Sequence, residues 1–219
     1  MNPRTAITLG GLVAGVLLFA TQPSLGGQIT NSKHDFRTSS WSGGQICVAC
    51  HAPHNTDVSV TDAPLWNHKN STVSYTLYSS ATMDAGALGQ PSGLSKLCLS
   101  CHDGTVAVDS FGGATGTTMI TGKSNLGITL KDDHPIGFTY DSTLATKDGA
   151  LADPSTSGVV IGAGAQTRTG TLAAMLLYNG KLECSSCHDV HNTFTADAGA
   201  KLVKITMAGS QLCLACHKK

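Results

Sequence analysis

The sequence predicts a mostly irregular fold with short helices and a few short strands. Two observations lead to this prediction. The pattern Cys-x-x-Cys-His occurs four times and uses all eight cysteines, so the chain is expected to be fastened at four points. Only 5% of its residues are aromatic and 25 of the 219 are glycine, which leaves few side chains for a large core. Long connections between attachment points are therefore expected in place of layers of helix or sheet.

The repeated motif is typical of covalent haem attachment, in which two thiols form thioethers with the porphyrin and the histidine binds one face of the iron. Only 9 of the 219 residues are histidine. The probability that a histidine follows each of four Cys-x-x-Cys pairs by chance is roughly one in 300,000. The sequence thus predicts four covalently bound c-type haems around which the chain folds. The cysteines are Cys47, Cys50, Cys98, Cys101, Cys184, Cys187, Cys213 and Cys216, and the proximal histidines are His51, His102, His188 and His217.

Zinc and disulfide bonds are the alternative uses of cysteine pairs at this spacing. Two zinc ions, each held by four thiolates, would consume all the cysteines. Four small disulfide loops would suit an exported protein. Neither alternative explains why a histidine follows every second cysteine, so covalent haem is favoured.

Residues 1–26 are predicted to be an export signal. Arg4 is the lone charge, Thr5–Ala20 is uncharged and mainly apolar, and Ser24–Gly26 supplies small residues for a cleavage site. The apolar run is shorter than the ~20 residues that a membrane-spanning helix requires. We therefore expect an exported protein with no membrane span once the signal is removed.

The four motifs alternate between two types, which indicates an internal repeat. The first and third share Cys-x-x-Cys-His-x-x-His-Asn, and the second and fourth share Leu-Cys-Leu-(Ser/Ala)-Cys-His. This order predicts two dihaem-like units, at about 34–103 and 182–219. A haem-free segment rich in glycine, serine and threonine, at 104–180, joins them into one domain, 27–219.

One strand and one helix are predicted around the second motif. Ser74–Tyr78 alternates polar with apolar or aromatic residues, as a half-buried strand does. Gly93–Asp103 is predicted to be a short helix that presents the second motif, with Ser92 or Ser95 as its N-cap.

The haem-free segment is predicted to contain one long loop and two strands. Thr139–Gly158 is expected to be an exposed loop, whereas Val159–Ile161 and Met175–Tyr178 are expected to be strands. Asn179 and Gly180 fit a type I′ turn that leads into the third motif.

Five histidines lie outside the motifs and compete for four distal positions on iron. Because imidazoles suffice for every iron, methionine ligands are not needed, which predicts bis-His ligation and low reduction potentials. The surplus histidine is not identified by the sequence. The candidates are His34, His54, His68, His134 and His191.

The surroundings of these histidines differ. His54 and His191 each lie three residues after a proximal histidine, so on a short helical turn they point to the same side and reach a neighbouring haem rather than their own. His68 follows a tryptophan that can pack on a porphyrin. Pro135 holds His134 in extended backbone geometry. A solvent-facing side chain is the alternative in each case.

Several sequence blocks resemble those of bacterial multihaem cytochromes with doubled CxxCH motifs, in particular the tetrahaem members found at the outer surface. The blocks are SKHDF, CHAPHN, PLWNH, LCLSCHDGTVAV, DDHPIGFTY and CSSCHDVHN. The resemblance implies that the chain is organised around a file of four haems. It also implies a secreted protein that passes through the periplasm to the cell surface and polymerises head to tail into a filament with a continuous file of haems. Such a filament receives electrons from partner cytochromes and delivers them to external acceptors such as metal oxides. The resemblance also favours His54 as a ligand donated to the next subunit, with His34 as the second candidate.

Other classes of protein are less favoured by the sequence. The chain carries 14 basic and 14 acidic residues, which excludes the basic surface of a nucleic-acid-binding protein. A multihaem enzyme needs an iron with one open face, whereas the distal candidates here suffice to close all four, so no catalytic residues are predicted. A monomeric periplasmic electron shuttle is the closest alternative to the filament.

Overall fold

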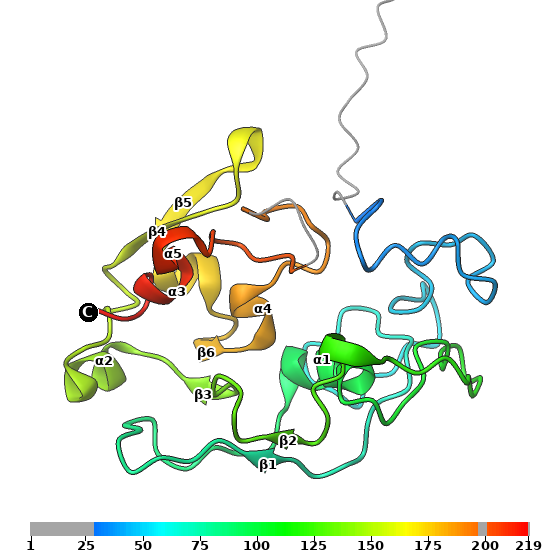
Figure 1. The fold of residues 1–219 in the computed structure, drawn as a ribbon, viewed down its shortest axis with the longest axis horizontal. Coiled ribbons are helices and arrows are strands. Elements are labelled where there is room, and N and C mark those ends of the chain that lie inside the picture. The colour runs from blue at the N-terminus through cyan, green and yellow to red at the C-terminus, as the bar shows by residue number, and fades with distance from the viewer. Residues whose placement is uncertain (1–28, 197–200, 219) are drawn as a thin grey trace, which may run out of the picture.

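The computed structural model describes residues 29–196 and 201–218, so the predicted export signal lies outside the described residues. Within them the chain is mostly irregular, with short helices and two-stranded pairings. Most of the N-terminal half lies to the right in Figure 1 and the C-terminal half to the left. Helices α1 (Gly93–His102) and α4 (Cys184–Cys187) pack against each other between the halves. The predicted fold class is confirmed, while the file of haems stays a prediction.

Residues 29–130 contain α1 and one strand pair. β1 (Thr76–Leu77) pairs in parallel with β2 (Thr129–Leu130), and the 3-10 turn η1 (Gly122–Ser124) precedes β2. β1 lies within the predicted strand Ser74–Tyr78, and α1 ends one residue before the predicted helix Gly93–Asp103. Both predictions are confirmed.

The C-terminal half contains two antiparallel pairings, β3 with β6 and β4 with β5. The strand predicted at Val159–Ile161 is confirmed as part of β4. The predicted turn is also confirmed, since φ is 49° at Asn179 and 74° at Gly180. The elements are β3 (Phe138–Thr139), α2 (Ser142–Asp148), β4 (Gly158–Ile161), η2 (Gly164–Gln166), β5 (Arg168–Thr171), α3 (Leu172–Leu176), β6 (Lys181–Leu182), α4, η3 (Ala208–Ser210) and α5 (Gln211–Leu214).

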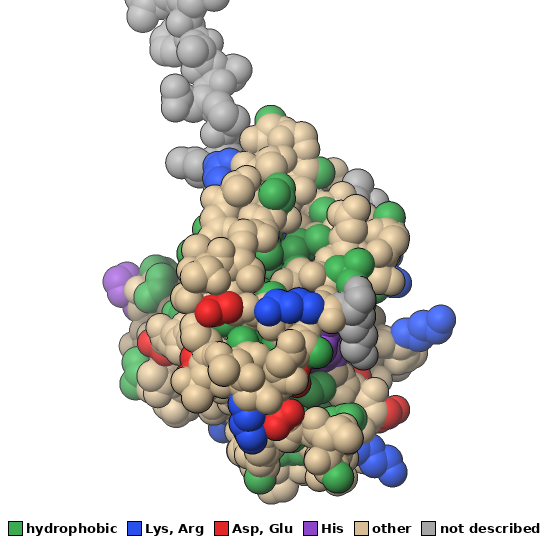
Figure 2. All heavy atoms as spheres, turned by 90° about the vertical axis from the view of Figure 1, so that its left-hand side faces the viewer, with side chains coloured by type: hydrophobic (Ala, Val, Ile, Leu, Met, Phe, Trp, Pro, Cys, Tyr) green, Lys and Arg blue, Asp and Glu red, His purple; other side chains and the backbone are tan. Residues whose placement is uncertain are grey.

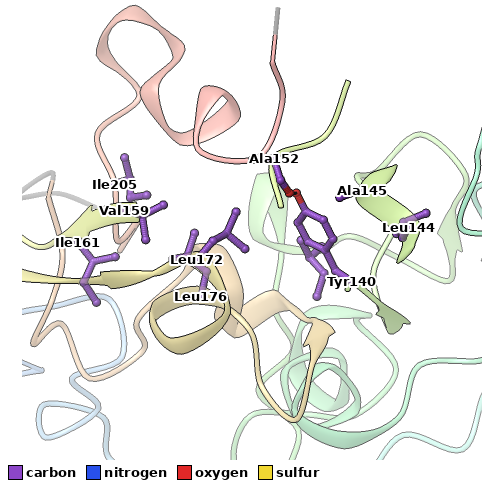
Figure 3. Close-up of a cluster of buried hydrophobic side chains, with 10 residues drawn as sticks. Tyr140, Leu144, Ala145, Ala152, Val159, Ile161, Leu172, Leu176 and Ile205 are labelled. Atoms are coloured by element: carbon purple, nitrogen blue, oxygen red, sulfur yellow. Dashed lines mark hydrogen bonds between the residues drawn. The ribbon is translucent and has the colours of Figure 1, made fainter. Parts of the chain in front are cut away.

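The main hydrophobic core lies between α2, α3 and the β4–β5 hairpin (Figure 3). Leu172 is fully buried, and Leu176, one helical turn later, is buried beside it. Tyr140 borders the core near α2 and donates its hydroxyl hydrogen to the Ala152 carbonyl oxygen at 2.7 Å. A second, smaller cluster packs beside α1 and consists of Val60, Trp66 and Leu97.

The surface carries both signs of charge. Lysine or arginine and aspartate or glutamate side chains are interspersed on the face drawn in Figure 2. None of the helices in 29–196 or 201–218 combines the length and the apolar character needed to cross a bilayer.

The prediction of an exposed loop at Thr139–Gly158 is wrong, because this stretch contains α2 and part of the core. Asp141 caps the helix by accepting a hydrogen bond from the Leu144 backbone N–H at 2.8 Å. Gly149 ends it in the left-handed region, with φ of 75°. Both signals are present in the sequence, but the glycine- and serine-rich composition around them conceals the helix.

The strand predicted at Met175–Tyr178 is also wrong, since α3 occupies its first half. Thr171 caps α3 by accepting a hydrogen bond from the Ala174 backbone N–H at 3.2 Å. The sequence Leu-Ala-Ala-Met-Leu favours a helix by intrinsic propensity, and burial of Leu172 and Leu176 on one face reinforces that preference.

Candidate haem centres

Each Cys-x-x-Cys-His motif is folded into one helical turn. In three motifs the histidine backbone N–H donates to the carbonyl oxygen of the first cysteine, at 2.8 Å for His51, 3.0 Å for His188 and 2.9 Å for His217. The second motif forms the end of α1, with His102 as the last residue. Side chains three residues apart on such a turn are neighbours, so each turn can present both thiols to one porphyrin edge.

Backbone carbonyl groups orient the proximal histidines. In three of them Nδ1 lies within hydrogen-bonding distance of a carbonyl oxygen, which can only accept, so Nδ1 carries the proton. Nε2 then keeps its lone pair for a metal, which is how ligating histidines are usually held. The bonds run from His51 to Pro64 at 2.6 Å, from His102 to Ser124 at 2.8 Å, and from His188 to Lys201 at 2.7 Å.

Three proximal histidines face a second imidazole from elsewhere in the chain. A ring nitrogen binds a first-row metal at about 2.0–2.1 Å, so two rings on opposite sides of one iron have centroids ~6–6.5 Å apart. The observed separations match this value, and the donor set therefore fits a haem iron. The centroid distances are 6.0 Å for His51 and His191, 6.0 Å for His102 and His34, and 6.4 Å for His217 and His134.

His34 offers a second test of whether a haem fits. Burial, followed by the charge of His102, lowers the pKa of His34 to about 4, which favours the neutral ring. Its Nδ1 is buried and has no hydrogen-bond partner among the described residues. A neutral imidazole is the form that binds metal, and a buried nitrogen without a partner is costly unless a ligand satisfies it.

His68 is placed differently from the other candidates. It is only 2% exposed, with Nε2 2.9 Å from the Ala107 carbonyl oxygen and Nδ1 2.8 Å from that of Lys69. Burial lowers the pKa of His68, although the two carbonyl groups favour the charged ring. The same ring lies against a haem-attachment residue, with Nε2 3.4 Å from the Cys101 Sγ. No second histidine ring lies opposite His68 among the described residues, and its role as a distal ligand stays a prediction.

His188 and His54 lack a facing imidazole of the kind seen in the three pairs. Both side chains are exposed, and no described histidine ring lies opposite either of them at that distance. His54 lines a surface groove of about 690 Å³, together with Asp57 and Lys69. Of the four proximal histidines, His188 is thus the one without a second histidine ring at that distance among the described residues.

The predicted helical turn after the motif histidines is wrong. His188 has extended geometry, with φ of −109° and ψ of 142°. The residue after each extra histidine is left-handed, with φ of 56° at Asn55 and 55° at Asn192. An extended segment and a tight turn, rather than one face of a helix, carry His191 away from its own motif.

Thiols of consecutive motifs lie within electrostatic range of one another. In each neighbouring pair, the adjacent thiol contributes with burial to raising the pKa of at least one member. The attachment points therefore follow one another in space in the same order as in the chain. The pairs are Cys50 with Cys101, Cys98 with Cys184, and Cys187 with Cys216.

The alternative uses of the cysteines find no support in the described residues. All eight cysteines are free thiols rather than disulfides. No group of three or more histidine, cysteine, aspartate or glutamate side chains converges in the part of the chain that the structure describes, as a zinc site would require.

Four helical turns with paired thiols, three of them with facing imidazoles, are the features of a multihaem c-type cytochrome. A comparison with protein families agrees, because the doubled CXXCH motif matches residues 178–219, which contain the third and fourth motifs. Cytochromes with paired motifs are generally electron-transfer proteins. Comparison with curated proteins finds no match to the chain.

The carbonyl acceptors of the proximal histidines escape prediction from the sequence, because every residue carries a backbone carbonyl group. One signal was available. The acceptor follows its histidine by 13 residues in both the first and the third motif, against 22 in the second. Once the acceptor of one of these two histidines is known, the internal repeat predicts the acceptor of the other.

Proposed function

We propose that the protein is a tetrahaem c-type cytochrome that carries electrons outside the cytoplasm along a file of four haems. The three facing histidine pairs support this proposal most directly, because the spacing of each pair fits one iron between its rings. The adjacency of consecutive thiols supports a file that follows chain order.

The side chains have distinct roles in this proposal. A bound haem supplies an iron that accepts and releases one electron. The cysteines fix one porphyrin edge to each helical turn, and the backbone carbonyl groups hold the proximal rings in the metal-binding tautomer. The distal rings close the second face of the iron. The assignments are His191 opposite His51, His34 opposite His102, and His134 opposite His217.

Closure of the iron favours electron transfer over catalysis. An imidazole on both faces leaves no position for a substrate, and it gives lower reduction potentials than ligation by histidine and methionine. We accordingly assign no catalytic residue.

We further propose that the iron on His188 receives its distal imidazole from His54 of a neighbouring copy. Both side chains are exposed, and neither faces another described histidine within the chain. His34, the other candidate, already lies opposite His102 in its own chain. A contact that joins two different surfaces of identical subunits does not close on itself and produces a filament when the rotation leaves it open.

The resemblance to outer-surface tetrahaem cytochromes supports this arrangement and its setting. In that setting the protein is exported through the periplasm to the cell surface, where partner cytochromes reduce one end of the filament. External acceptors such as metal oxides receive electrons from it.

A monomeric shuttle or a redox enzyme is the second candidate. The exposed His188 favours it, because an iron there without a distal ligand would be open to small molecules. Carbon monoxide separates the two functions. The reduced, assembled filament should resist carbon monoxide at all four irons, whereas an enzyme would bind one equivalent in every state of assembly.

The proposal is tested by His54→Ala, with Lys69→Ala as a matched control from the same groove. His54→Ala should keep four covalent haems by the alkaline pyridine assay, yet form no filaments by electron microscopy. Lys69→Ala should keep both properties, because it removes an exposed side chain from the groove but no imidazole. Fewer than four haems in the unaltered protein contradicts the tetrahaem assignment, and normal filaments from His54→Ala contradict the donated ligand.

A further inference from the structure

Glu183 is a buried carboxylate that the proposed electron transfer leaves unexplained. Its residue is 3% exposed, and it lies immediately before the third motif, where α4 packs against α1. Among the described residues no lysine or arginine forms an ion pair with it. A buried charge is retained only when hydrogen bonds or a counter-charge compensate its loss of water.

Hydrogen bonds from both haem-bearing helices compensate this charge. The carboxylate accepts from the Ser95 hydroxyl, and from the Ser95 backbone N–H at 3.3 Å. It also accepts from the backbone N–H of Ser186, while the Glu183 N–H donates to the Ser186 hydroxyl at 2.9 Å. Ser95 and Ser186 are almost completely buried. One side chain therefore satisfies the first turns of two helices.

The first turn of α1 depends on this distant residue. Ser92 occupies the N-cap position of α1 but makes no side-chain hydrogen bond. Glu183, 88 residues from Ser95, supplies the missing acceptor. The Ser95 hydroxyl also accepts a hydrogen bond from the Cys184 backbone N–H at 3.1 Å, so the link runs directly to a haem-attachment residue.

The two helices carry neighbouring attachment points. The thiols of Cys98 on α1 and Cys184 on α4 lie close enough to shift each other's pKa, which rises for Cys98 and falls for Cys184. Any change in the packing of α1 on α4 therefore changes the distance and the angle between the second and third haems. The carboxylate lies in the same contact, where burial weakens the screening of its charge by solvent and salt.

We propose that Glu183 is a positioning residue that fixes the second haem relative to the third and lowers the reduction potential of this pair. This inference rests on the proposed tetrahaem function. A fixed negative charge stabilises the oxidised, more positive iron relative to the reduced one, which lowers the potential. Electron exchange between the two haems oxidises one iron as it reduces the other, and Glu183 itself takes no part in the redox change.

Three variants of the haem-loaded full chain separate the two effects. Glu183→Gln removes the charge but keeps an oxygen that accepts hydrogen bonds. Glu183→Ala removes both. Ser92→Ala is the matched control, because it alters the exposed N-cap position of the same helix, where no side-chain bond exists.

The readouts are the circular dichroism couplet of the Soret band, which reports haem–haem geometry, and a potentiometric titration. We expect Glu183→Gln to retain the couplet and to shift the potentials of two of the four haems upward. Glu183→Ala should lose couplet amplitude as well, and Ser92→Ala should match the parent in both measurements.

Two results overturn the inference. They are unchanged potentials in Glu183→Gln, and a parental couplet in Glu183→Ala. If Glu183→Ala does not fold, Glu183→Gln alone still decides the effect of the charge. A haem count below four in the parent protein contradicts the proposed function instead, so the two failures are distinguishable.

Discussion

The first and third motifs have equivalent surroundings, yet only the third keeps its extra histidine opposite another imidazole of the same chain. In both, the proximal histidine forms a bridge with a residue 15 positions later, Trp66 or Val203. The residue before that partner is left-handed in both, with φ of 52° at Leu65 and at Leu202. These shared features make the two loops a matched pair.

The loops differ at the residue that follows the motif histidine, which is Asp189 in one and Ala52 in the other. The Asp189 carboxylate accepts hydrogen bonds from three backbone N–H groups, of His191 at 3.1 Å, Thr193 at 2.7 Å and Phe194 at 2.6 Å. Ala52 has no side-chain acceptor. The third loop is therefore fastened by its own side chain and the first is not.

This difference is consistent with the two roles that we propose for the histidine after each motif. His191 is held in a fastened loop, with its ring opposite that of His51. His54 extends from an unfastened loop into an exposed groove, where a second subunit can reach it. Under the proposal, the hydrogen bonds of Asp189 hold His191 in place for ligation within the chain. The first loop lacks such bonds, which suits a histidine that becomes ordered only when subunits assemble.

The largest effect on this comparison is expected from His191→Ala. Removal of the ring leaves the iron on His51 without a distal ligand, whether or not subunits assemble. One of four haems should become high-spin in the electron paramagnetic resonance spectrum and bind carbon monoxide when reduced. Val190→Ala, an exposed change in the same loop, should leave all irons as in the parent. A low-spin spectrum for His191→Ala would remove His191 from the ligand set.

An intermediate effect is expected from Asp189→Ala. It leaves three backbone N–H groups of the loop without their acceptor, and the loss of a comparable side-chain acceptor at a helix N-cap costs about 0.5–2 kcal/mol. The free energy of unfolding should fall by that amount, and part of the iron on His51 should become high-spin. Asp189→Asn should keep most of the parent's free energy of unfolding and a largely low-spin iron on His51, because the amide oxygen can accept the same hydrogen bonds. Equal effects of the two substitutions would show that the charge, not the hydrogen bonding, fastens the loop.

The smallest effect is expected from Ala52→Asp, which gives the first loop the acceptor of the third. A new hydrogen bond to the His54 backbone N–H contributes about 1 kcal/mol. Amide hydrogen exchange at His54 and Asn55 should slow several-fold in the dissociated protein. Unchanged exchange would mean that features beyond Asp189 distinguish the loops.

The sequence predicts the fold class and the helix at the second motif well, and it predicts poorly which histidine rings lie near one another. The fold class and α1 follow from composition and from the apolar residues around the second motif. The helix α2 is missed because its cap, Asp141, and its stop, Gly149, lie in a segment of loop-like composition. Capping residues and composition can predict different structures for the same segment. Burial decides between them, and burial depends on contacts with distant residues.

The histidines show the same limit. The block that contains His68 looks like the other ligand blocks, and only its burial against the Ala107 and Lys69 carbonyl groups sets it apart. The partner of His34 is a motif 68 residues away, a distance that no local pattern specifies. The contact of Glu183 with Ser95 could not be predicted from local sequence either, because the two residues lie 88 positions apart on different helices.

The most direct test of the account is electron paramagnetic resonance of the oxidised protein, recorded on dissociated subunits and on filaments. The structure places a second imidazole about 6 Å from three of the proximal histidines. The proposal makes these the distal ligands of three irons, and it gives the fourth iron its imidazole on assembly. Dissociated subunits should therefore show three low-spin irons and one high-spin iron, and filaments should show four low-spin irons. Spectra that do not change on assembly, or more than one high-spin iron in the subunit, would contradict it.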